Sequence, residues 1–282
     1  MLFRSELGRL ASSFAARILV FSARNKSDDN QTDWARVHDY SANGIEKDFA
    51  PLADDVLWYS IYHSYANYSG WTQTDMYVVN MMDPSMPSRW VDEETWFLVQ
   101  NPVMSHTEGV DDRIFTDYQY LSSCPFRRDR GYYHFSCYRY KRLDQYLHTW
   151  TEPMPEFRKV ENDYLLAEAA ARTGRLQEAA GIINASPRTT RGGLPPVPAT
   201  AEAVAAAIHH ERMVELMSSG PGIQFFQMRK EDLLQAGTPL HFPIPEAQLL
   251  IMGMDYYTFG GTEGTEEGTA GAPGIDYSIG GW

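Results

Sequence analysis

The chain has 282 residues, of which 43% are hydrophobic and 22% are charged, so we expect one large packed domain or two ordinary ones rather than disorder. Its formal net charge of −13 argues against a nucleic-acid partner, because a duplex-binding protein needs a positive surface to neutralise phosphates. No stretch of the sequence approaches the roughly 18 uninterrupted apolar residues of a membrane-spanning helix.

The first 47 residues have the pattern of two antiparallel helices. Apolar residues at steps of three and four predict an amphipathic helix over residues 6–23, and its charged residues argue against a signal peptide there. A polar segment, residues 25–32, separates it from a second helix, which Asp33 caps and Trp34 begins. The apolar residues of the first helix are Leu7, Leu10, Phe14, Ile18 and Phe21.

Residues 48–151 lose the helical period, because Pro, Gly, Asn and aromatic residues interrupt it repeatedly. We expect one helix over residues 54–68, short strands within residues 76–79 and 132–140, and long ordered loops elsewhere. Long loops in a compact domain are usually functional. This segment is therefore interpreted as a loop-rich insertion in a helical protein.

The C-terminal region returns to helices. Residues 162–185 predict a helix pair with a turn at Gly174, and this run resembles the turn and second helix of a tetratricopeptide repeat. A further helix is expected over residues 203–217, followed by a short helix around Leu233. The glycine-rich tail, residues 260–282, favours no regular element.

Together these elements predict a mainly α fold, with a tetratricopeptide-like helical-repeat scaffold, long aromatic-rich loop insertions and short strands. We interpret residues 1–282 as a single domain. Its parts are a helical repeat pair at 1–47, the insertion at 48–151, a C-terminal helical region at 152–259 and the tail at 260–282.

Histidines and cysteines do not form a metal motif. His134 with Cys137, or His209 with His210, are the candidate ligands, but adjacent residues on a helix point about 100° apart, away from one shared ion. We therefore expect no metal and no cofactor. The loop between Cys124 and Cys137 permits a disulfide in an oxidising compartment, while two free thiols agree equally well with the count.

Charged residues near the end of the helix predicted over residues 203–217 suggest structure rather than catalysis. Arg212 and Glu215 are three residues apart, so they are expected to meet on one helix face, either as a surface ion pair or as a clamp on the segment Phe225–Phe226. Neighbouring carboxylates elsewhere are interpreted as solvated or helix-capping, which makes a hydrolase the weakest hypothesis. We expect no enzymatic activity.

Aromatic residues make up 13% of the chain, with 17 Tyr and 7 Trp, and many of them fall in the insertion. Sugars stack their flat apolar faces on Trp and Tyr, while Asn, Asp and Arg bind the hydroxyls. Packing in loops is the ordinary role of any single aromatic, but as a set they predict one ligand-recognition surface. The candidate ligand-binding residues are Trp71, Tyr77, Trp90, Trp96, Tyr118, Tyr120, Tyr132 and Tyr133.

Four motifs in order strengthen the binding hypothesis. They are Leu166-Ala167-Glu168-Ala169, then Glu211-Arg212-Met213-Val214-Glu215-Leu216, then the aromatic run Ile223–Arg229, and finally Phe242-Pro243-Ile244-Pro245-Glu246. Their order resembles the C-terminal region of SusD/RagB proteins, a family of outer-membrane nutrient-binding proteins. The family's secretion signal, lipid-attached Cys and first helices have no counterpart here, so we expect the chain to be the C-terminal part of such a protein.

The resemblance implies a right-handed helical-repeat scaffold decorated by loops. It also implies residence on the outer membrane, facing outward, as a lid over a SusC-like TonB-dependent transporter. Ligands in the family are glycans or, in the RagB branch, peptides.

The alternative reading is a tetratricopeptide-type scaffold that binds protein partners. An incomplete repeat scaffold exposes an apolar helix face, so self-association through the first helix is a further expectation.

Overall fold

The computed structural model describes residues 2–61, 63, 67–70, 73–88, 93–102, 105, 107–122, 135–147, 149–220, 222–234 and 244–255. This part of the chain is mainly α-helical, and its one sheet has two strands, β1 (Tyr118–Tyr120) and β2 (Tyr138–Tyr140). The predicted mainly α fold class is confirmed. The chain divides into two compact units, one of residues 1–20 and 33–224 and the other of residues 21–32 and 225–282.

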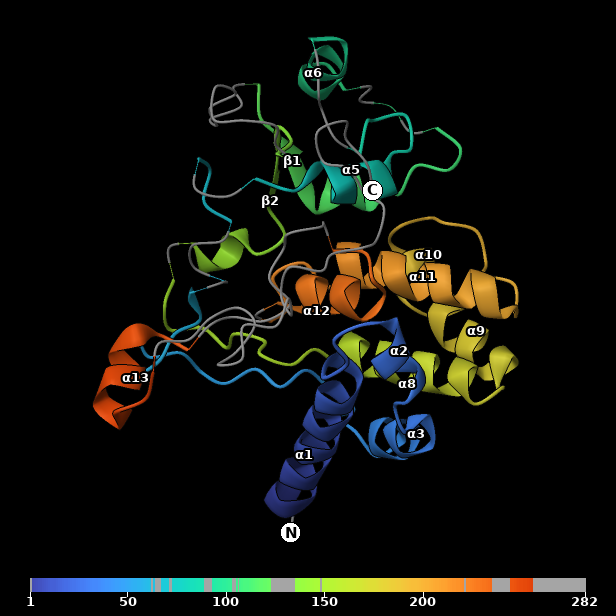
Figure 1. The fold of residues 1–282 in the computed structure, drawn as a ribbon. Helices are drawn as coiled ribbons and strands as arrows, with labels where there is room; N and C mark the ends of the chain where they lie inside the picture. Colours follow the sequence, from blue (N-terminus) through green and yellow to red (C-terminus); the bar gives the residue numbers. More distant parts are fainter. Residues whose placement is uncertain are drawn as a thin grey trace. The chain divides into compact units, whose positions relative to one another are not determined.

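Helices stacked side by side form the scaffold of the first unit. Helix α8 (Lys159–Arg172) packs against α3 (Trp34–Ala42), α9 (Leu176–Asn184) and α11 (Ala201–Val214), as Figure 1 shows. Small residues on α8 and α9 allow this close approach. Gly174, at φ +82°, turns the chain between α8 and α9, as the sequence predicts. The core residues are Ala167, Ala170, Ala179, Ala180, Ile183, Val197, Val204, Ala207 and Ile208.

The N-terminal helix α1 (Leu2–Phe21) is fastened to α8 by polar contacts. The Ser13 hydroxyl donates a buried hydrogen bond of 2.7 Å to Asn162 Oδ1. Arg17 forms a salt bridge with the buried Glu161, its Nη2 donating to Oε2 at 2.6 Å. A Cβ on Gly44 would lie 2.2 Å from Asn162 Oδ1, so only glycine fits beside this contact.

The insertion contains more helix than the sequence predicts. Its elements are α5 (Met76–Met82), α6 (Glu93–Gln100), α7 (Arg113–Thr116), β1, β2 and the 3₁₀ turn η2 (Asp144–Tyr146). The predicted strand at residues 76–79 is wrong, because the Asp75 carboxylate accepts the Tyr77 N–H at 2.8 Å and caps α5. The strand predicted within residues 132–140 is confirmed over residues 138–140 at β2, which pairs antiparallel with β1, while residues 132–134 lie outside the described part of the chain.

The predicted helix over residues 54–68 is wrong in its first part, because residues 54–60 are not helical. One oxygen of the Asp54 carboxylate accepts the backbone N–H groups of Val56, Leu57 and Trp58. A carboxylate that binds three successive amides holds them in a turn and removes them from a helical ladder.

The C-terminal part adds three further helices, α10 (Pro187–Thr190), α12 (Ile223–Lys230) and α13 (Glu246–Met252). The predicted short helix around Leu233 is wrong, because the helix ends at Lys230 and the Leu233 N–H closes the turn onto Met228 O at 2.8 Å. Most of the predicted Pro-Ile-Pro segment and the whole glycine-rich tail lie outside the described residues.

The second unit joins residues 21–32 to the segment that begins at residue 225. It includes α2 (Lys26–Asn30), which lies within the polar segment that the sequence marks as a break. Arg229 Nη2 donates to Phe21 O at 2.8 Å, and Lys230 Nζ forms a buried salt bridge with Asp29 at 3.0 Å. This unit therefore contains a buried ion pair.

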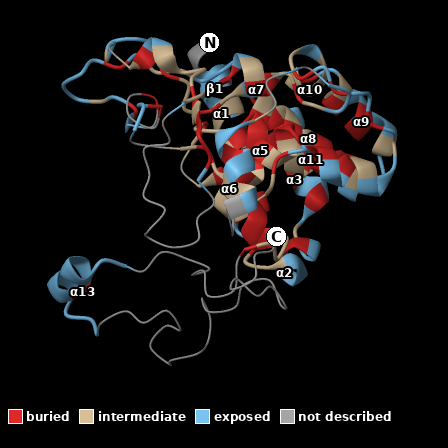
Figure 2. Cartoon of the chain, turned by 90° about the horizontal axis from the view of Figure 1, so that it is seen from above, coloured by how far each residue is buried: buried red, intermediate tan, exposed pale blue. Residues whose placement is uncertain are grey.

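Many of the buried residues lie on the helices of the scaffold. In Figure 2 the buried residues gather on α3, α5, α8 and α11. Several charged side chains belong to this core and are fully buried with it, among them Arg113, Glu211, Arg212 and Glu215. Buried charges are costly unless each has a partner, so their contacts define a site that needs explanation.

Candidate functional site

The Glu-Arg motif of α11 is buried and does not pair with itself. The predicted Arg212–Glu215 ion pair is wrong: Arg212 Nη1 instead donates to Glu168 Oε2 on α8 at 2.6 Å. Glu168 belongs to the Leu-Ala-Glu-Ala run, so this buried contact joins the first two sequence motifs. Pairing between helices satisfies charges that an exposed pair on one helix would leave to water.

Arg113 of α7 occupies the centre of the charge cluster. Its Nη2 lies 2.6 Å from Asp111 Oδ2 and 2.7 Å from Glu211 Oε1, and its Nη1 lies 3.2 Å from Glu215 Oε2. Ligand atoms of Asp111, His210 and Glu211 all lie within 4.8 Å of one another, as in a metal site. The guanidinium of Arg113 already supplies the cation to both carboxylates of this cluster.

Glu215 accepts from four arginines. Arg142 Nη1 and Arg158 Nη2 donate to Oε1 at 2.7 and 2.5 Å, while Arg113 and Arg191 bind Oε2. Burial alone would raise the pKa of this carboxyl, but Arg158, Arg142 and Arg191 overcome that effect and lower the pKa to about 2. Glu215 is therefore ionised at neutral pH.

This cluster fastens the insertion to the scaffold. Arg113 and Arg142 come from the insertion, whereas Glu211 and Glu215 come from α11 and the turn after it. The Tyr118 hydroxyl adds a hydrogen bond to Val214 O at 3.2 Å. We define these arginines and carboxylates as the anchor network: Asp111, Arg113, Asp117, Arg142, Arg158, Arg188, Arg191, Glu211 and Glu215.

The structure describes four of the eight candidate aromatic residues. Tyr77 and Trp96 lie half-buried on α5 and α6 rather than in loops, and the Tyr77 hydroxyl lies 2.8 Å from His209 Nε2. Tyr120 on β1 is half-buried and donates to Gln100 O. Tyr118 is 1% exposed and offers no face to a ligand. The others, Trp71, Trp90, Tyr132 and Tyr133, lie outside the described residues.

The structure describes one of the two cysteines. Cys137, beside β2, is buried and disulfide-bonded, while Cys124 and His134 lie outside the described residues. Of the two hypotheses, the structure therefore supports a disulfide at Cys137 and not a free thiol.

A polar pocket of about 340 Å³ opens beside the anchor network. Arg142 and Arg158 line it, together with the buried side chains of His63, Tyr140 and Tyr146. We name it the arginine pocket. Its lining residues are Asp48, His63, Tyr140, Arg142, Leu143, Gln145, Tyr146, Pro155, Arg158, Met217, Ser218 and Ser219.

Sequence reasoning did not identify this pocket, because its residues come from five separate stretches of the chain. One signal was present: Glu211 and Glu215 are four residues apart on one helix face, and two buried carboxylates require cations from elsewhere. The sequence does not show which arginines supply them.

His63 makes the arginine pocket sensitive to pH. Burial and the neighbouring Arg158 lower its pKa to about 4, so the folded protein holds this imidazole neutral. In the unfolded chain His63 takes up a proton near its ordinary pKa of 6.5, so the free energy of unfolding falls as the pH drops from 6.5 towards 4.

Urea denaturation of the parent and of the His63→Gln variant at pH 7 and pH 5 tests this assignment. Between these pH values, we expect the free energy of unfolding to fall by about 2 kcal/mol less in the variant than in the parent. Equal losses would contradict this assignment.

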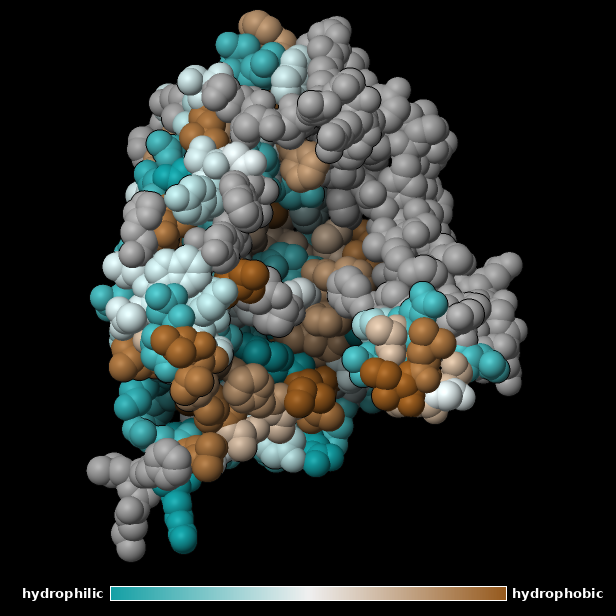
Figure 3. All heavy atoms as spheres, turned by 90° about the vertical axis from the view of Figure 1, so that its left-hand side faces the viewer, coloured by the Kyte–Doolittle hydropathy of each residue, from teal (hydrophilic) through white to brown (hydrophobic). Residues whose placement is uncertain are grey.

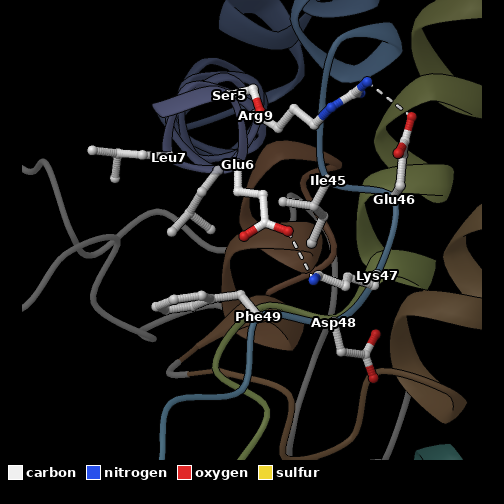
Figure 4. A pocket seen from close by; sticks show the side chains of 10 residues that line it. Ser5, Glu6, Leu7, Arg9, Ile45, Glu46, Lys47, Asp48 and Phe49 are labelled. Carbon is white, nitrogen blue, oxygen red and sulfur yellow. Dashed lines mark hydrogen bonds and ion pairs between the residues drawn. The ribbon is translucent and has the colours of Figure 1, made fainter. Parts of the chain in front are cut away.

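A second pocket, of about 570 Å³, lies between the start of α1 and residues 45–49. Figure 4 shows the Glu6 carboxylate directed at Lys47 and Arg9 directed at Glu46, with salt bridges of 2.8 and 2.9 Å. Phe49 completes its wall. Figure 3 shows hydrophobic residues gathered in the lower part of one face of the molecule.

No helix among the described residues combines the length and apolarity that crossing a bilayer requires. No protein-family model and no curated protein matches the chain. Among solved structures, it is similar to the crystal structure of a SusD superfamily protein from Bacteroides vulgatus ATCC 8482, with a TM-score of 0.41 and 16% identity. The match covers 78% of this chain and 50% of that protein, so the chain spans about half of its length.

Proposed function

We propose that the chain is a SusD/RagB-type nutrient-binding protein that captures a glycan or an oligopeptide without transforming it. It acts at the cell surface, on the outer membrane, and delivers its ligand to a SusC-like TonB-dependent transporter. The ordered motifs of the C-terminal half support the family, and the aromatic residues of the insertion support the ligand class.

One observation carries the binding role: the motif glutamates of α11 hold the insertion through Arg113 and Arg142. A recognition surface built on irregular segments loses affinity if binding has to order it first. Attaching the insertion at a buried ionic cluster removes part of that entropic cost. This role needs no pair of catalytic residues, because capture requires only that the binding groups are correctly positioned.

The exposed face of α1 supports a second candidate, a scaffold for protein partners. Leu7 and Ile18 are 53% and 64% exposed on the same helix. Exposed apolar side chains that gather on one element indicate a contact surface. Self-association of the chain is one form of this role, and analytical ultracentrifugation distinguishes it: a dimer favours the scaffold reading, and a monomer argues against it.

The test of the capture role is a titration of the purified chain with a panel of glycans and oligopeptides, followed by tryptophan fluorescence. We expect saturable binding by one ligand class, with no product formed. The Trp96→Ala or Tyr120→Ala variant should weaken that binding at least about tenfold, equivalent to roughly 1.4 kcal/mol.

Tyr40→Ala is the matched control, since Tyr40 is an aromatic of the scaffold whose hydrogen bonds, within the described residues, go to Arg36 on its own helix. It should leave the affinity unchanged. A folded chain that binds nothing in the panel would move the assignment to the scaffold role.

A further inference from the structure

We infer that the arginine pocket recognises the carboxylate of an acidic ligand. This inference rests on the proposed capture function and narrows its substrate class to molecules that carry a carboxylate, namely acidic sugars or peptides. The supporting observations are the charge balance at the pocket, the uncommitted donors of Arg142 and the neutral polar atoms around them.

The charge balance leaves the pocket side of the anchor network positive. Arg113 is neutralised by Asp111 and Glu211, and Arg191 by Asp117. Arg142 and Arg158, which line the pocket, have one close carboxylate between them, Glu215, and it also serves the other two arginines. Two cations therefore share one buried anion at the pocket wall, because the other carboxylate that lines the pocket, Asp48, is exposed and screened by water. A half-buried excess of positive charge favours an anionic ligand, because screening by water is weaker there.

Arg142 has donors to spare. Only its Nη1 is engaged, with Glu215 Oε1 at 2.7 Å and, more distantly, with Asp117 Oδ2 at 3.8 Å. Within the described part of the chain, its Nε and Nη2 have no partner, and the side chain is 27% exposed. The Nε–Nη2 edge of a guanidinium is the planar fork that binds both oxygens of a carboxylate at once.

Arg158 serves a different purpose. Its Nη1 donates to Glu215 O at 2.6 Å and to Ser219 Oγ at 3.1 Å, and its Nη2 donates to Glu215 Oε1 at 2.5 Å. These bonds hold the turn after α11 in place. Arg158 thus adds positive charge, while Arg142 provides the binding edge.

Three neutral groups can complete the recognition. The Tyr140 hydroxyl and the Ser218 hydroxyl make no hydrogen bond within the described residues, and both residues line the pocket. His63 binds Ser60 Oγ through Nδ1 at 2.7 Å, which leaves Nε2 without a partner among those residues. Asp48, the one carboxylate that lines the pocket, accepts the Lys159 N–H at 2.7 Å and suits a sugar hydroxyl or a peptide amine.

The experiment compares ligands that differ only in charge. Isothermal titration of the full chain uses tri-galacturonate against its methyl ester, and Ala-Ala-Ala against its C-terminal amide. We expect one acid to bind at least about tenfold more tightly than its neutral counterpart, as a charge-assisted bidentate contact gives. The pair that shows the difference identifies the source, uronate or peptide terminus.

Variants then assign the difference to Arg142. In Arg142→Gln the preference for the acid should vanish, whereas Arg142→Lys, which retains the charge without the fork, should keep only part of it. Arg175→Gln removes one charge at an exposed pair with Glu178 and should change nothing. The comparison of acid with ester in the parent chain needs no variant, so it holds even if a substitution impairs folding.

Each outcome is decisive. Equal affinity for acid and neutral ligand, or a preference that persists in Arg142→Gln, overturns the carboxylate site while leaving the capture function standing. Binding of neither acid at millimolar concentration also overturns the site. If the wider glycan and peptide panel is silent as well, the capture function fails with it, so the two failures are distinguishable.

Discussion

The Glu215→Gln variant should lose about 3–5 kcal/mol of the free energy of unfolding, measured by urea denaturation at neutral pH. The substitution keeps the shape of the side chain and removes the anion that four arginines share. Arg142 and Arg158 would then be left at the pocket wall without their close counter-charge. Removing one partner from a buried ionic cluster leaves the other charges desolvated and uncompensated, which costs far more than the loss of one hydrogen bond.

Glu178→Gln is the matched control for this loss. Glu178 is 40% exposed and pairs with His38 and Arg175, so water already solvates its charge. Its substitution should change the free energy of unfolding by less than about 0.5 kcal/mol. If Glu215→Gln were as mild as this control, the anchor network would not hold the insertion, and the support for the capture function would weaken with it.

The second large effect is expected in the other compact unit. Asp29→Asn removes the carboxylate that lies 3.0 Å from Lys230 Nζ, and both side chains are at most 1% exposed. The buried ammonium group would lose the carboxylate that lies beside it, so we expect a loss of about 3–5 kcal/mol in the stability of this unit. Hydrogen exchange should show faster opening of α2 and of the end of α12, while exchange in α8 and α11 stays as in the parent chain.

A double variant separates charge from packing at this site. Asp29→Leu combined with Lys230→Met replaces the pair by apolar side chains and leaves neither charge isolated, so it should recover more than half of the stability lost by Asp29→Asn. If hydrogen exchange in the double variant were as fast as in Asp29→Asn, the hydrogen bonds of Asp29, and not its charge balance with Lys230, would be what stabilises the unit.

The sequence determined the helices with a sustained period. The apolar steps of α1, the Asp33 cap of α3, the turn at Gly174 and the body of α11 are all local signals, and the structure contains each of them. The same local reasoning mistook Met76–Val79 for a strand and residues 54–60 for a helix. In both places a single aspartate decides the backbone, because its carboxylate binds amides that the periodic pattern does not take into account.

Site residues were harder to foresee than helices. Of the candidate aromatics described, Tyr77, Trp96 and Tyr120 keep part of their surface, whereas Tyr118 lies in the core. A tyrosine looks the same in the sequence whether it is buried in the core or exposed at the surface. Only the packing of β1 against its neighbours shows that Tyr118 is buried and Tyr120 is half-exposed. Arg142 and His63 gave no signal at all, because neither belongs to a motif.

The sequence by itself therefore determined the helical class, the family resemblance and the acidic charge that argues against nucleic acid. Only the tertiary structure decided where the buried charges meet. Glu168 meets Arg212, and Glu211 and Glu215 meet Arg113, across separations of 44, 98 and 102 residues. Helix periodicity is set by neighbours within four residues, whereas an ion pair between helices depends on how their faces pack, and no local pattern records that choice.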